Sequence, residues 1–172
     1  CPGVGDDTAN AVALLTVAGH IAREKLTPKG CGILLVINSG EEGLGNLKGS
    51  RKIMADFGSR VKEFVTFDGN TSAIVTKAVG SRRYRVTVRT EGGHSYGKFG
   101  ASNAIAQLSQ LIAKLYEIKV PPIGKTTYNV GTISGGTSVN TIAQKAEMLF
   151  EFRSDEREGL AIMQSDFDRI VE

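Results

Sequence analysis

The sequence predicts a mixed α/β chain with two units: a partial parallel-sheet α/β unit over residues 1–77 and an α+β unit over residues 78–172. Two observations carry this prediction. Residues 1–75 alternate between helical apolar spacing and apolar runs, which is typical of a parallel sheet with helices against it. The remaining residues combine alternating segments, typical of half-buried strands, with amphipathic segments typical of helices.

In the first unit, residues 8–26 carry apolar side chains at helical spacing, with Asp7 or Thr8 available as the cap. Residues 31–38 (CGILLVIN) form a continuous apolar run, which predicts a strand buried on both faces. Residues 43–57 predict a shorter helix, and residues 61–67 (VKEFVTF) predict the next strand. The expected order is therefore helix, strand, helix, strand.

In the second unit, residues 81–91 alternate strictly and predict a half-buried strand, and residues 102–118 predict an amphipathic helix that ends before Pro121 and Pro122. Residues 125–134 and 145–153 predict two more strands, and residues 155–172 predict a final helix. This β-α-β-β-α order lacks one closing strand of a ferredoxin-like sandwich.

The composition is that of a globular protein, with 41% hydrophobic and 23% charged residues. A net charge of +3 argues against a dedicated nucleic-acid-binding protein, and we expect no nucleic-acid partner. No run reaches the roughly 20 apolar residues of a membrane span, so we expect no membrane partner and a cytoplasmic location. The basic cluster alternates with apolar residues and predicts the polar face of a strand; its members are Arg82, Arg83, Arg85 and Arg89.

Acidic residues follow the predicted strands and precede the first helix. Glu41 and Glu42 come after residues 31–38, Asp68 comes after residues 61–67, and Asp6 lies in a Gly-flanked turn. Ligands bind beyond the carboxyl ends of strands in open α/β sheets, so the three turns can converge there. Each turn also has a structural explanation as a helix cap or a tight turn. Three like charges at one edge favour a cation between them, although zinc usually requires histidine or cysteine as well.

Five segments resemble, in order, the motifs of the metallopeptidase family that includes peptidase T, carboxypeptidase G and acetylornithine deacetylase. They are GVGDDTANAV, NSGEEGLGNLKGSR, FDGN, GGHSYGKFGASNAI and GGTSVNTIAQKAEMLFEFR. The resemblance implies a partial catalytic domain over residues 1–77 and a dimerisation or lid domain over residues 78–172. It also implies a homodimer formed through the lid domain.

The resemblance implies a site with two Zn²⁺ ions, for which Co²⁺ or Mn²⁺ can substitute. Asp6 corresponds to the aspartate that bridges the two metals, with a cis peptide bond to Asp7. Glu42 and Asp68 correspond to ligands of one metal each, and Glu41 corresponds to the general base. The implied reaction is attack on an amide by a metal-activated water whose proton Glu41 removes.

The lid motifs imply three further residues. His94 corresponds to a histidine that enters the partner subunit's active site and polarises the substrate carbonyl. Asn140 and Arg153 correspond to substrate-binding residues, and Arg153 is suited to a carboxylate.

The implied substrate is a small peptide cleaved by an exopeptidase, or an N-acyl amino acid cleaved by a deacetylase of the same family. The family's first and last metal-binding histidines have no counterpart in this chain, so we expect a fragment that is inactive by itself. A non-catalytic dimerisation module is the alternative function for the isolated chain. A phosphate-binding loop is disfavoured because the Gly-rich turn lacks the lysine of a P-loop.

Overall fold

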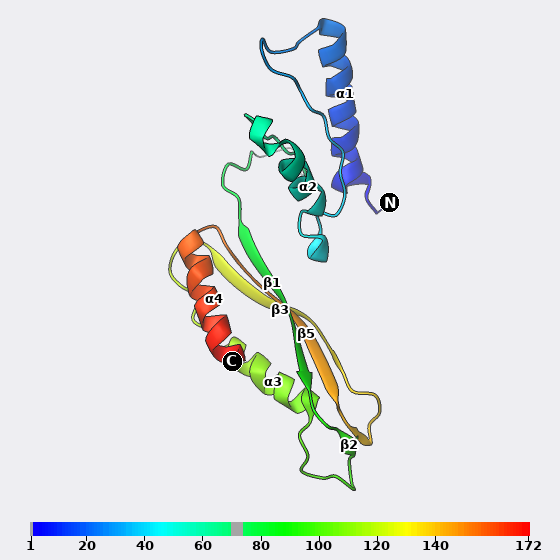
Figure 1. Ribbon diagram of the computed structural model, residues 1–172, viewed down its shortest axis with the longest axis vertical. Coiled ribbons are helices and arrows are strands. Elements are labelled where there is room, and N and C mark those ends of the chain that lie inside the picture. Colours follow the sequence, from blue (N-terminus) through cyan, green and yellow to red (C-terminus); the bar gives the residue numbers. More distant parts are fainter. Residues whose placement is uncertain (1, 70–73) are drawn as a thin grey trace. The chain divides into compact units, whose positions relative to one another are not determined.

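The computed structural model describes residues 2–69 and 74–172 (Figure 1). The chain divides into two compact units, Cys1–Ile74 (unit 1) and Val75–Glu172 (unit 2). Asn70, the last residue of the FDGN motif, lies outside the described residues. In the described part of the chain, no helix is both long enough and apolar enough to cross a membrane.

Unit 1 is built from helical elements and irregular segments. The expected first helix is confirmed as α1, Ala9–Glu24, and ends where Lys25 adopts a left-handed conformation with φ of 54°. The expected second helix is confirmed as α2, Lys48–Phe57. Three short helical turns complete the unit: η1 Val4–Thr8, η2 Gly43–Gly45 and η3 Gly58–Arg60.

The two strands expected in unit 1 are not formed in the described residues. Residues 31–38 and 61–67 run as irregular chain without strand pairing. After α1 the chain turns back along that helix (Figure 1). Ile33 and Leu35 line a shallow hollow together with Ala18 and Ile21 of α1. A strand needs a neighbouring backbone for its hydrogen bonds, and neither segment has one in the described part of the chain. The mixed α/β class is confirmed, but the paired strands all lie in unit 2.

Unit 2 contains a three-stranded antiparallel sheet in the order β1-β5-β3 and two helices. The predicted β-α-β-β-α order is confirmed. Its elements are β1 Gly80–Arg89, α3 Ala104–Leu115, β3 Thr126–Gly135, β5 Lys145–Ser154 and α4 Arg157–Val171. A second, two-stranded pairing joins β2, Gly93–His94, to β4, Thr141–Ile142. The sequence does not predict it, because two-residue strands carry no readable periodicity.

Both helices pack on one face of the sheet and enclose the core of unit 2. Asn103 caps α3, since its Oδ1 accepts hydrogen bonds from the backbone N–H groups of Ile105 and Ala106. Phe150 of β5 stacks on Phe167 of α4 with ring centroids 5.4 Å apart. Each fully buried aromatic side chain contributes on the order of 2 kcal/mol through removal from water.

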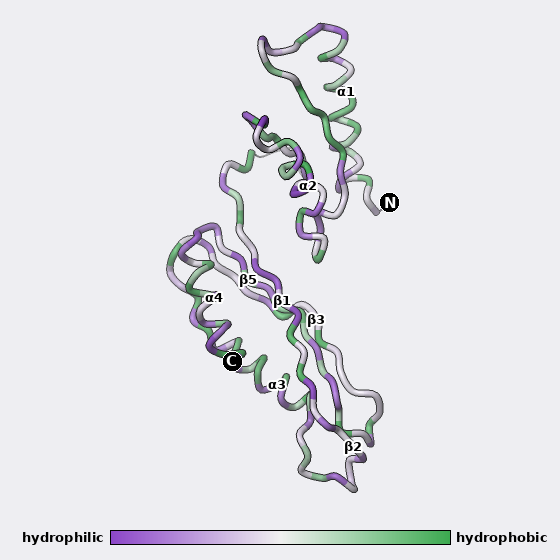
Figure 2. The backbone as a smooth tube through the Cα atoms, in the orientation of Figure 1, coloured by the Kyte–Doolittle hydropathy of each residue, from purple (hydrophilic) through white to green (hydrophobic). Residues whose placement is uncertain are grey.

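The opposite face of the sheet is charged. The first half of β1 is hydrophilic, and hydrophilic and hydrophobic residues alternate along its second half (Figure 2). Arg83 Nε lies 3.2 Å from Glu151 Oε2, and Arg85 Nε lies 3.7 Å from Glu147 Oε1. The expectation that the arginine cluster marks the polar face of a strand is confirmed for these two residues.

Candidate functional site

The short β2–β4 pairing brings two of the predicted site residues together at one end of unit 2. His94 lies opposite Thr141 in this pairing. The backbone N–H of Ser95 donates a 3.0 Å hydrogen bond to the carbonyl oxygen of Asn140. The histidine motif and the Asn motif, far apart in the sequence, therefore form two adjacent turns. We call residues 92–100 and 136–141 the tip.

His94 is exposed, and its surroundings define its orientation. Its carbonyl oxygen accepts a 2.9 Å hydrogen bond from Lys98 N–H, which closes the first turn of the tip. Its Nδ1 lies 3.4 Å from Gly97 N–H, which donates to it. A neutral imidazole that accepts at Nδ1 carries its proton on Nε2. In that tautomer, Nε2–H is the group that His94 can donate.

Asn140 is also exposed and is held by its own turn. Its Oδ1 accepts a 2.6 Å hydrogen bond from Ser138 Oγ. The backbone N–H of Thr141 donates to the carbonyl oxygen of Ser138 at 3.2 Å. Because Oδ1 is used within the turn, the Nδ2 amide group is the part of Asn140 suited to donate to a ligand.

Glycine permits the close approach of the strands that carry the tip. A Cβ on Gly92, whose φ is 65°, would collide with the side chain of Gln144 and lie 2.8 Å from the carbonyl oxygen of Ile142. The approach is stabilised by two hydrogen bonds: Gln144 Nε2 donates to Glu91 O at 2.9 Å, and Thr90 Oγ1 donates to Ala143 O at 2.8 Å. The Gly-Gly pair before the histidine is the one sequence signal that could have indicated this crossing.

Arg153 does not lie with His94 and Asn140. It sits near the far end of β5, opposite Ser81 and Thr127, whereas the tip adjoins the beginning of β5. A strand rises about 3.3 Å per residue, so Arg153 lies roughly 25 Å from Lys145, the first residue of β5. Arg153 Nε donates to Glu151 Oε1 at 3.0 Å. The structure thus separates the three predicted lid residues into a pair and one distant arginine.

Glu151 has two cationic neighbours, and they determine its pKa. Partial burial raises the pKa of its carboxyl group, but hydrogen bonds from Arg153 and Arg83 and their positive charges lower it. The net pKa lies below its ordinary value of 4.5. Glu151 is therefore a negatively charged partner of both arginines near neutral pH.

In unit 1, a buried asparagine joins two of the acidic turns. Asn10 is 6% exposed and is the one buried residue among the described residues of this unit. Its Nδ2 donates to Asp7 Oδ1 at 2.6 Å and to Gly69 O at 3.4 Å. The turns that carry Asp6 and Asp68 are therefore linked through Asn10, which the sequence analysis missed. The Asp6–Asp7 peptide bond is cis, as the resemblance implies.

Glu41 and Glu42 lie in a separate set of turns. The carbonyl oxygens of Glu41 and Glu42 accept backbone hydrogen bonds from Leu47 N–H at 3.1 Å and Gly45 N–H at 2.8 Å. The capping-box explanation does not apply, because α2 begins later, at Lys48. Within the described residues, no group of three or more His, Cys, Asp or Glu side chains is arranged to hold a metal ion. Among the described residues, Asp6, Glu42 and Asp68 are thus not gathered into such a group.

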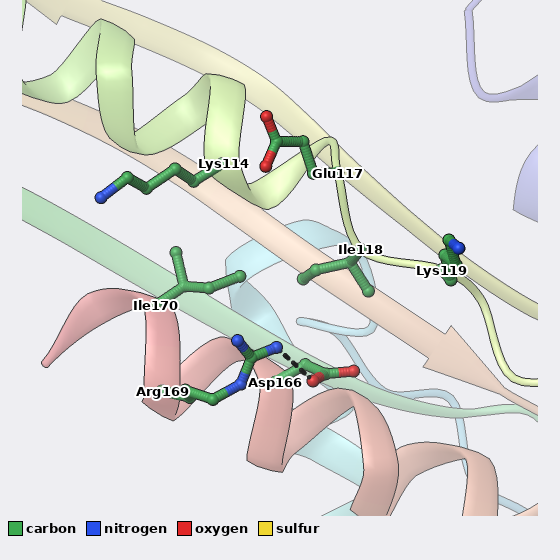
Figure 3. A pocket seen from close by; sticks show the side chains of 7 residues that line it. All are labelled: Lys114, Glu117, Ile118, Lys119, Asp166, Arg169 and Ile170. Carbon is green, nitrogen blue, oxygen red and sulfur yellow. Dashed lines mark hydrogen bonds and ion pairs between the residues drawn. The ribbon is translucent and has the colours of Figure 1, made fainter.

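A shallow hollow between the ends of α3 and α4 is separate from these residues. Figure 3 shows it lined by charged side chains and two isoleucines, with Arg169 paired to Asp166 at 2.8 Å. None of the predicted site residues lines it. Its lining mixes three basic and two acidic side chains, which is typical of a solvated surface.

Comparison with known proteins identifies the family. The family model of the peptidase dimerisation domain matches residues 76–172, more than half of the chain. The chain belongs to the M20 peptidase dimerisation-domain family. The peptidase family that the five motifs indicate is thereby confirmed.

Solved structures match a little over half of the chain, and the first two named here have the same fold. An aminobenzoyl-glutamate utilization protein from Klebsiella pneumoniae has 21% identity and a TM-score of 0.51, over 54% of this chain and 24% of that chain. An amidase of the hydantoinase/carbamoylase family from Burkholderia phymatum has 22% identity and a TM-score of 0.51, over 56% and 25%. The aminopeptidase PepT from Bacillus cereus has 23% identity and a TM-score of 0.49, over 57% and 26%. The matched part spans about a quarter of each of these proteins.

Proposed function

We propose that residues 1–172 belong to a longer hydrolase of amide bonds, in which unit 2 is the dimerisation and lid domain and residues 1–77 are part of the catalytic domain. The observation that carries this proposal is the tip, where His94 and Asn140 lie in adjacent turns joined by the Ser95–Asn140 hydrogen bond. The family match and the small share of related structures that this chain covers support it.

The tip supplies two hydrogen-bond donors, His94 Nε2–H and Asn140 Nδ2–H. Donors held in place before the reaction stabilise negative charge that develops on a carbonyl oxygen. A small peptide is the proposed substrate, and an N-acyl amino acid is the alternative within the same family. Arg153 lies too far from the tip to bind a small molecule that His94 and Asn140 of the same chain also bind. We therefore propose a substrate-binding role for Arg153 only at a second site or toward a second copy of the chain.

The metal chemistry belongs to the proposal for the longer protein. We propose Asp6, Glu42 and Asp68 as ligands of a zinc pair, with Co²⁺ or Mn²⁺ as substitutes, and Glu41 as the general base. Since the described residues do not assemble these groups as a three-donor site, we expect weak zinc binding by residues 1–172. Isothermal titration calorimetry measures this directly, and tight binding of two zinc ions per chain would contradict it.

The deciding experiment compares the two histidines of the sequence in the longer protein. His94→Ala is expected to lower kcat for dipeptide hydrolysis by about 100- to 1000-fold, the usual loss on removing one donor to the oxyanion. His20→Ala is the matched control, because His20 is an exposed residue of α1 outside the tip. We expect it to change kcat by less than about twofold. Equal activity of His94→Ala and the unmodified protein would refute the proposed function.

A second candidate applies to the isolated chain: a dimerisation module without catalysis. The family match covers unit 2, and all members of the hydrophobic core cluster lie there. Exposed sheet edges also offer unpaired backbone groups to another chain. Size-exclusion chromatography with light scattering distinguishes the candidates, since a strict monomer at high concentration argues against self-association through unit 2.

A further inference from the structure

The tip carries the most exposed large hydrophobic side chains of residues 80–172 in unit 2. Val139, Phe99 and Tyr96 are 103%, 93% and 89% exposed. Between residues 80 and 172, the next such side chain is Ile133, at 56%. Single exposed apolar residues are ordinary, but this concentration in the two turns that carry His94 and Asn140 indicates a surface that contacts something apolar.

Backbone hydrogen bonds hold these side chains outward. Tyr96 and Phe99 lie in consecutive turns closed by Lys98 N–H to His94 O at 2.9 Å and Ala101 N–H to Lys98 O at 3.0 Å. Val139 is the second residue of the turn that the hydrogen bond from Thr141 N–H to Ser138 O closes at 3.2 Å. The turns are therefore formed without packing of the apolar side chains, which stay available to a ligand.

The charge of the tip narrows the chemistry of that ligand. Lys98 is the one charged residue of the tip, and its stem lies against Gly93, since a Cβ there would collide with the Lys98 side chain. A basic side chain placed at the tip would meet the like charge of Lys98. A charged side chain covered by Val139 and Phe99 would also lose its hydration. Lys98 is the one charged residue of the tip that could neutralise it.

We propose that Val139, Phe99 and Tyr96 determine substrate specificity by contacting an uncharged apolar side chain next to the scissile amide. This inference rests on the proposed function, because it requires His94 and Asn140 to address that amide. Val139 is the neighbour of Asn140 in the chain, and Tyr96 lies two residues from His94. The favoured substrates are small peptides with a leucine-like side chain beside the bond that is cleaved.

The experiment measures selectivity in the longer protein with leucyl-glycine, glycyl-leucine and glycyl-glycine as substrates. Selectivity is the kcat/KM for the better leucine dipeptide divided by the kcat/KM for glycyl-glycine. We expect Val139→Ser and Phe99→Ser to lower this ratio by about 10-fold or more. Val120→Ser is the matched control: Val120 is a half-exposed valine between α3 and β3, at the other end of the sheet. It is expected to leave the ratio unchanged within about twofold.

An unchanged kcat/KM ratio in both tip variants overturns the inference. An equal loss of kcat/KM for all three dipeptides also overturns it, because the tip would then contact protein rather than substrate. Thermal melting verifies that each variant is folded, and the exposed positions predict an unaltered midpoint. His94→Ala is measured in parallel. If His94→Ala loses activity while the tip variants keep the ratio, the proposed function stands and the specificity inference fails. If His94→Ala keeps full activity, the proposed function itself fails.

Discussion

Unit 2 encloses its hydrophobic side chains, whereas unit 1 exposes them. Every residue of the core cluster lies in unit 2, and all of them except Ile118 and Ala143 belong to β5, α3 or α4. In unit 1, the buried residue among those described is the polar Asn10. Apolar side chains of α1 and of the runs 31–38 and 61–67 are largely exposed, among them Leu15, Leu34 and Phe67.

Both units contain apolar patterns that predict helices and strands, so the difference comes from pairing. In unit 2, β5 is hydrogen-bonded on both sides, by β1 and β3, and presents a continuous face to two helices. In unit 1, the two apolar segments have no strand pairing in the described residues, so no sheet face is available to cover α1. An apolar sequence pattern therefore creates a core only where a paired sheet or a second helix is available to enclose it.

The largest expected effect tests whether stability resides in unit 2. Phe150→Ala removes a side chain that is 1% exposed and stacks on Phe167, and we expect it to lower the free energy of unfolding by about 3–5 kcal/mol. Leu15→Ala, at a position 61% exposed in α1, is expected to change it by less than about 0.5 kcal/mol. Urea unfolding is followed by tyrosine fluorescence, which reports on unit 2 because all four tyrosines lie there, and by far-ultraviolet circular dichroism, which reports on the helices of both units. Equal losses in the two variants would contradict the comparison.

An intermediate effect tests how closely α4 sits on the sheet. A Cβ on Gly159 would collide with Ser154 Oγ and lie 2.8 Å from Thr126 Oγ1, and these two hydroxyls are hydrogen-bonded at 2.9 Å. Gly159→Ala is therefore expected to cost about 1–3 kcal/mol of stability despite the better helix propensity of alanine. Gly97→Ala is the control, because no atom lies within 4 Å of its added Cβ. The same urea titration serves, and a stabilised Gly159→Ala variant would show that the helix can shift.

The smallest expected effect concerns the charged face of unit 2. Because the pKa of Glu151 is lower in the folded state than its ordinary value of 4.5, its ion pairs stabilise unit 2 fully above that value. The stabilisation is lost as the pH falls through the folded-state pKa. Glu151→Gln should thus lower the melting temperature at pH 7 by a few degrees at most and by less near pH 3. Differential scanning calorimetry at both pH values checks this prediction. A larger fall in melting temperature at pH 3 than at pH 7 would contradict it.

Much of unit 2 was predictable because its signals are local. The helix at residues 104–115 follows from apolar spacing and from the cap at Asn103, and β1 and β5 follow from strict alternation. The expected strands in unit 1 were not formed in the described residues, because an apolar run indicates burial and does not supply a hydrogen-bonding neighbour. The β2–β4 pairing and the bridging role of Asn10 depend on residues far apart in the sequence and left no periodic signal.

The sequence by itself determined the family, through five motifs in order, and the longer helices and strands of unit 2, through the spacing of apolar residues. Only the tertiary structure decided which polar residues meet. It joined His94 to Asn140 through a two-residue strand pairing and placed Arg153 at the opposite end of β5. The physical reason is that side-chain periodicity acts within one element, whereas a site requires contacts between elements, which pairing and close backbone approach at glycine establish.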